Sequence, residues 1–122
     1  MMTHDFATRF AEEWIADWNS HDLDRILSHY ADDFEMSSPY IPKIVGETSG
    51  LLKGKATVAA YWAKALGRMP GLHFELHCTL VGTDSLVIYY KGAKGMAAEF
   101  FSFGPNGKVM KSCAHYCKLR AT

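Results

Sequence analysis

Four strand-length runs fill the second half of this 122-residue chain and constrain its fold more than any other feature. The runs are "LHFELHCTLVG", "SLVIYYKG", "GMAAEFFSFG" and "KVMKSCAHYCKL", and they are rich in aromatic and β-branched residues. The connections between them are short and rich in turn residues: Thr83-Asp84, residues 92–95 and Pro105-Asn106-Gly107. Because such connections force consecutive strands to run antiparallel, the second half predicts an antiparallel meander.

The first half predicts three helices. Over residues 5–19, four aromatic side chains recur every four positions, and the polar residues, Asp17 among them, take the opposite face. Asp22 is predicted to cap a short second helix, and the pattern of residues 55–69 indicates a third helix. Residues 31–38 predict a strand ending before a proline, and residues 41–54 predict an irregular surface loop. The order indicates one α+β domain over 1–122, with three helices against a curved antiparallel sheet.

Composition excludes several classes of function. The formal net charge is +0, which argues against a nucleic-acid groove and favours self-association. The three cysteines, Cys78, Cys113 and Cys117, are predicted to be reduced, mostly buried thiols of a cytoplasmic protein. His115 lies between the last two, but on a strand these residues are too spread out for one ion, so no metal is predicted. No signal or membrane-spanning segment is recognisable in the sequence.

Three stretches carry a family resemblance: "WNSHDLDRILSHYADDFEMSSP", "GKATVAAYWAKAL" and "FFSFGPNGKVMKSCAHY". In this order they resemble the nuclear transport factor two-like superfamily, and within it the SnoaL-like and ketosteroid-isomerase-like branch. The resemblance implies a cystatin-like cone in which the sheet curls around the first helix. It also implies a mostly apolar pocket between sheet and helices, and a homodimer formed through the outer sheet face. The family includes isomerases, dehydratases, cyclases and epoxide hydrolases, besides binding domains without activity, so fold alone selects no function.

The resemblance to ketosteroid isomerase assigns three positions. Its base aspartate falls on Ser38, its oxyanion-stabilising tyrosine on Trp14, and its protonated aspartate on Glu99. Serine does not remove a carbon-bound proton unaided, and an indole N–H is a weak donor. A steroid isomerase acting by that mechanism is therefore not expected. Glu99 remains the main catalytic candidate, and Ser38 is a second candidate that binds a ligand or positions a water.

Strand alternation places Glu99 on the same face of its strand as Ala97 and Phe101, and both faces of this strand are apolar. We therefore expect Glu99 to be buried, which favours its neutral form and suits an acid or hydrogen-bond donor. The alternative is a structural carboxylate bonded to a neighbour such as a tyrosine or serine. An indole N–H of Trp14 or Trp18 is a further candidate donor to it. On the last strand, alternation and the resemblance place His115 outside the pocket, unless a bulge reverses the strand. The expected ligand-contacting residues are Trp14, Trp18, Trp62, Tyr116, Ser112, Phe101 and Tyr40.

Two functional hypotheses follow. The first is a cofactor-free isomerase, cyclase or dehydratase that acts on an apolar, polyketide- or steroid-like molecule with Glu99 as acid or base. The second is a dimeric ligand-binding or accessory domain without activity, because an aromatic pocket with one polar anchor suffices for binding. A scaffold of the nuclear-transport kind is a weaker third reading.

Overall fold

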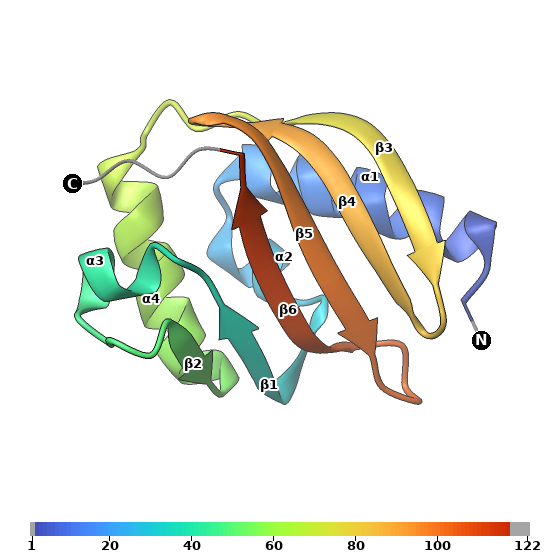
Figure 1. Ribbon diagram of the computed structural model, residues 1–122, viewed down its shortest axis with the longest axis horizontal. Coiled ribbons are helices and arrows are strands. Elements are labelled where there is room, and N and C mark those ends of the chain that lie inside the picture. The colour runs from blue at the N-terminus through green and yellow to red at the C-terminus, as the bar shows by residue number, and fades with distance from the viewer. Residues whose placement is uncertain (1, 118–122) are drawn as a thin grey trace.

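The computed structural model describes residues 2–117 of the protein. A curled six-stranded sheet forms one layer, and helices pack against its concave face (Figure 1). This arrangement confirms the predicted α+β class. The helices are α1 (His4–Ser20), α2 (Leu23–Leu27), α3 (Ile41–Val45) and α4 (Lys55–Arg68). The strands are β1 (Tyr30–Ser37), β2 (Leu51–Lys53), β3 (Glu75–Gly82), β4 (Ser85–Gly92), β5 (Gly95–Phe103) and β6 (Val109–Tyr116).

The sheet order is β2-β1-β6-β5-β4-β3. Strands β3 to β6 form the predicted antiparallel meander. Strand β1 pairs parallel to β6, and this pairing was not predicted. The segment 41–54 is not an irregular loop throughout. It contains α3 and the short β2, so the prediction was wrong there, and the described chain has four helices instead of three. The predicted last strand extends to residue 119, and residues 118–119 lie outside the described part.

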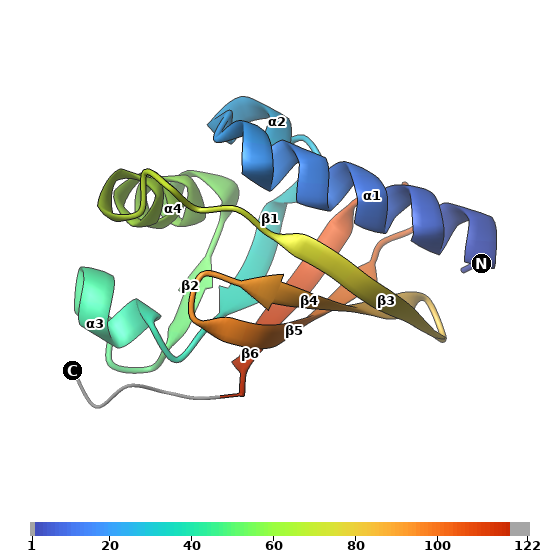
Figure 2. The same cartoon turned by 90° about the horizontal axis from the view of Figure 1, so that it is seen from above.

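Helix α1 begins and ends with local hydrogen bonds that its sequence provides. The Phe6 backbone N–H donates to Thr3 Oγ1 at 3.1 Å, which caps the helix start. The chain leaves the helix at His21, whose φ of 60° is left-handed and whose N–H donates to the Trp18 carbonyl. The aromatic stripe of α1 is buried against the sheet, and Figure 2 shows the helix lying across it.

Asp17 is the exception to the two-faced pattern of α1, because it is buried. Arg25 Nε donates to Asp17 Oδ1 at 3.0 Å, and His29 Nε2 lies 2.6 Å from Oδ2. The expectation of a solvent-facing Asp17 was therefore wrong. The aspartate ties α1 to α2 and to the start of β1, and its charge is tolerated because two side chains satisfy it.

The end of α1 also fixes the segment that leads into β3. Asn19 Oδ1 accepts from the Phe74 N–H at 2.7 Å, and Asn19 Nδ2 donates to the Phe74 carbonyl at 3.0 Å. His21 Nε2 lies 2.8 Å from the Leu72 carbonyl oxygen. Phe74 is thereby held with its ring stacked on Trp14, with centroids 5.7 Å apart. Among residues 2–117, no helix has the length and hydropathy needed to cross a membrane.

Candidate functional site

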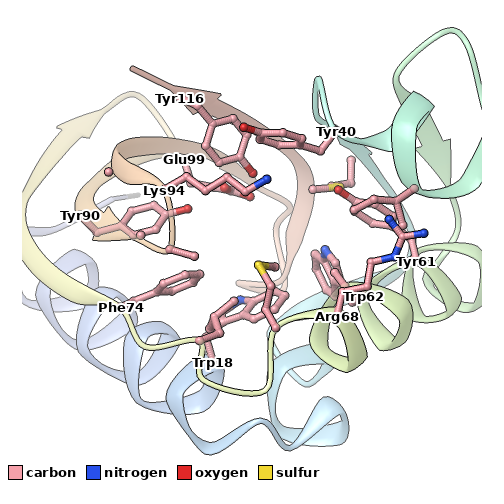
Figure 3. Close-up of a pocket in the computed structure, with 18 of the residues that line it drawn as sticks. Trp18, Tyr40, Tyr61, Trp62, Arg68, Phe74, Tyr90, Lys94, Glu99 and Tyr116 are labelled. Atoms are coloured by element: carbon pink, nitrogen blue, oxygen red, sulfur yellow. The ribbon is translucent and has the colours of Figure 1, made fainter. Parts of the chain in front are cut away.

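A cavity of about 410 Å³ opens between the concave sheet face and helices α1, α3 and α4 (Figure 3). Its wall is largely aromatic. Helices α1 and α4 contribute Trp14, Trp18, Tyr61 and Trp62, and the sheet contributes Tyr90, Glu99 and Tyr116. The volume accommodates an organic molecule of a few fused rings, and the shape agrees with the pocket that the resemblance implied.

Glu99 points into this cavity from the middle of β5. Its neighbours Ala97 and Phe101 share the inner face and are buried, so the predicted strand alternation is confirmed. The Glu99 side chain is 4% exposed, and no donor within residues 2–117 hydrogen-bonds its carboxyl group. Burial raises the pKa of Glu99 from 4.5 to about 8. Near pH 7 the group is therefore mostly a neutral carboxylic acid.

Four tyrosine hydroxyls surround this acid: those of Tyr30, Tyr61, Tyr90 and Tyr116. Burial raises the pKa of each phenol, and the nearby Glu99 carboxylate raises it further. All four phenols therefore keep their protons and act as neutral hydrogen-bonding groups. Tyr90 and Tyr116 lie on either side of Glu99 in Figure 3.

The tryptophans do not bond Glu99. Trp14 Nε1 donates instead to the Tyr30 hydroxyl at 3.0 Å, so this indole stabilises the core. Trp18 Nε1 is buried and has no hydrogen-bond partner within the described residues, although its ring lines the cavity and lies 5.2 Å from Trp62. Neither indole N–H donates to Glu99, so the suggested bond between them was wrong.

Ser38 lies behind the cavity wall. It is buried, and its Oγ accepts from the Tyr40 N–H at 3.1 Å. Burial is the main influence on the pKa of Tyr61 and Tyr116, and side-chain hydrogen bonding with Ser38 lowers both pKa values in turn. Ser38 thus contacts Tyr61 and Tyr116 from behind and is not itself on the wall of the main cavity.

Two other predicted ligand contacts, Phe101 and Ser112, lie on the inner sheet face but outside the cavity wall. Both are fully buried, and Phe101 packs edge-on against Phe10 at 5.0 Å between ring centroids. Helix α1 covers this part of the sheet, which is why they belong to the packed core. Tyr40 and Tyr116 do line the cavity, with ring centroids 4.8 Å apart. The structure therefore brings together five of the seven predicted contacts: Trp14, Trp18, Trp62, Tyr40 and Tyr116.

Several lining residues escaped the sequence reasoning. Tyr90 pairs in register with Ala97, so alternation along β4 carried the signal that places it beside Glu99. Phe74 precedes β3, and its position depends on the Asn19 contacts. Lys94 and Arg68 lie in a turn and at a helix end, where no periodic pattern marks them.

The outer sheet face carries His115 and Cys113, as alternation predicted, and both border a shallow hollow away from the cavity. Cys78 and Cys117 are exposed in the single chain, so the expectation of mostly buried thiols was wrong. In the described part of the chain, no three His, Cys, Asp or Glu side chains gather in a way that would hold a metal ion.

Comparison with known proteins gives the same architecture. A family model for the SnoaL-like domain matches residues 11–117. A SnoaL-like protein of unknown function from Burkholderia thailandensis E264 is 58% identical, with a TM-score of 0.91 over 95% of this chain and 98% of that one. No protein with curated annotation matches the sequence significantly.

More distant solved structures share the fold alone. A protein of unknown function with a cystatin-like fold from Methylobium petroleophilum PM1 is 16% identical, with a TM-score of 0.75 over 98% of this chain and 81% of that one. The epoxide hydrolase/cyclase-like enzyme SalBIII, which has a role in pyran ring formation in the polyether salinomycin, is also 16% identical. Its TM-score is 0.71 over 94% of this chain and 93% of that one.

Proposed function

This chain belongs to the SnoaL-like domain family, and on that premise we propose that its cavity binds an apolar, ring-containing small molecule on which Glu99 moves a proton. The reaction class is a cofactor-free isomerisation, cyclisation or dehydration of a polyketide- or steroid-like compound. The single observation that supports this proposal is the buried carboxyl of Glu99, which faces an aromatic cavity with its pKa raised to about 8 by burial.

A pKa close to the working pH suits both directions of proton transfer. Near pH 7 roughly one carboxyl in ten is ionised. The ionised form takes a proton from a carbon beside a ligand carbonyl, and the electron pair of the broken C–H bond moves onto the carbonyl oxygen. The resulting enolate accepts a hydrogen bond from a neutral phenol on the wall, that of Tyr90 or Tyr116. In a conjugated enolate the carboxylic acid then returns the proton to a different carbon, which shifts the double bond and completes an isomerisation.

A binding domain without activity is the second candidate, and two contacts favour it. Ser38 stands where the resemblance places a base aspartate, and its hydroxyl accepts the Tyr40 N–H. Trp14 stands where the resemblance places an acidic phenol, and its N–H donates to Tyr30. Both side chains are committed to structural hydrogen bonds, and among residues 2–117 Glu99 is the one carboxylic acid that lines the cavity.

Hydrogen–deuterium exchange of a bicyclic ketone separates the two candidates. In deuterated buffer, 2-tetralone exchanges the protons beside its carbonyl slowly, and mass spectrometry follows the rate. An enzyme of the proposed class accelerates this exchange by about 10² or more, and Glu99→Gln returns it to the buffer rate. Glu75→Gln, an equal change on the exposed part of β3, keeps the acceleration.

Exchange at the buffer rate with wild-type protein would contradict the catalytic proposal. If calorimetry still detected ligand binding under those conditions, the binding-domain candidate would hold.

A further inference from the structure

The mouth of the cavity is cationic. Lys43 on α3, Arg68 at the end of α4 and Lys94 in the β4–β5 turn all line it. Glu99, the acid on the wall, lies deep inside and is mostly neutral near pH 7. The whole chain has equal numbers of acidic and basic residues, 13 of each, so this excess of positive charge is local.

Lys94 is directed across the opening. Its Nζ lies 4.5 Å from the centroid of the Tyr40 ring, which belongs to the opposite rim. Figure 3 shows the Lys94 side chain extending in front of Glu99 toward Tyr40, with Arg68 on the α4 side of the same opening. A cation over a tyrosine face is held by the ring quadrupole while its N–H groups remain available to an anion.

No acid within the described residues neutralises Lys94 or Arg68. Within residues 2–117, ion pairs are formed by Arg25, His29, Lys55 and Lys91, and neither Lys94 nor Arg68 has a carboxylate within 4.0 Å there. The cavity therefore presents positive charge at its mouth.

We infer that the ligand of this cavity is an organic anion, a ring-bearing carboxylic or enolic acid whose charged group binds between Lys94 and Arg68. The ring system enters the aromatic interior, where Trp18 and Trp62 supply the wall. This inference rests on the proposed binding of a ring-containing molecule and adds an acidic group to what was expected to be an apolar ligand.

A matched pair of probes tests the inference by calorimetry: naphthalene-2-carboxylate and its neutral amide, naphthalene-2-carboxamide. The two have almost the same shape, and only the first carries charge near pH 7. We expect wild-type protein to bind the carboxylate about fivefold more tightly, because each exposed ion pair contributes about a twofold to fivefold gain. Added salt should reduce this preference, since it screens exposed charges.

The double variant Lys94→Gln with Arg68→Gln should lose the preference while its affinity for the amide stays within about twofold. Lys64→Gln, which removes an exposed charge from α4 outside the cavity wall, should keep the preference. Equal wild-type affinities for the two probes, or a preference that survives the double variant, would overturn the anion inference and leave the proposed function standing. Binding of neither probe would overturn both.

Discussion

The strongest consequence of burying Glu99 is that the free energy of unfolding depends on pH. The size of this dependence follows from the raised pKa of the carboxyl group. The pKa rises from 4.5 in the unfolded chain to about 8 in the folded protein, a difference of about 3.5. Each pKa unit corresponds to about 1.4 kcal/mol, so the full contribution is about 5 kcal/mol. This is a large fraction of the stability of a small domain.

The sign follows from which state holds the proton. Glu99 is an acid whose pKa is higher in the folded chain, so between pH 4.5 and about 8 the folded state is protonated and the unfolded state is ionised. Stability therefore decreases as pH rises through this window, because the unfolded state binds fewer protons. Below pH 4.5 both states are protonated and the penalty vanishes, whereas above about pH 8 it is complete.

Urea denaturation of wild-type protein and Glu99→Gln across this pH range measures the effect. The variant carries a neutral amide of similar shape at every pH, so the difference between the two free energies of unfolding isolates the carboxyl. Relative to the variant, the wild type should lose about 5 kcal/mol between about pH 4 and about pH 9. Glu75→Gln, which changes an exposed acid, should run parallel to the wild type. Parallel curves for wild type and Glu99→Gln would refute the reasoning, because they would mean that Glu99 titrates equally in both states.

Two further predictions concern the core and the outer sheet face. Asp17→Asn should lower the free energy of unfolding by about 2 kcal/mol, because it removes the charge that satisfies Arg25 and His29. Urea denaturation checks this, with Glu13→Gln on the exposed side of α1 as the control. Equal stabilities of the Asp17→Asn and Glu13→Gln variants would contradict the prediction. We also propose that a second copy of the chain covers the outer sheet face, where Leu80 is 58% and Tyr89 39% exposed beside Phe100. Phe100→Asp should then convert a dimer to a monomer in light scattering, whereas a wild-type mass equal to one chain would contradict the proposal.

Sequence reasoning succeeded where a local pattern determines the structure. The burial of Glu99 follows from two-residue alternation in a run with apolar residues on both faces, and the stripe of α1 follows from four-residue spacing. The three hairpins follow from their turn residues. Each of these needs information only from neighbouring positions.

The features that escaped prediction depend on contacts between distant segments. Asp17 is polar and sits on a polar helix face in the sequence, and only the approach of His29 and Arg25 allows its burial. The parallel pairing of β1 with β6 joins segments separated by most of the chain. Lys94 belongs to the cavity because the β4–β5 turn faces α3, and nothing in the sequence around residue 94 records that arrangement.

The clustering of indoles has a practical consequence for every binding experiment on this protein. The chain contains three tryptophans, and all three line the same cavity. Its tryptophan fluorescence therefore originates entirely from that one cavity. A compound that enters the cavity should alter the emission of the whole molecule, so occupancy can be followed without any added label.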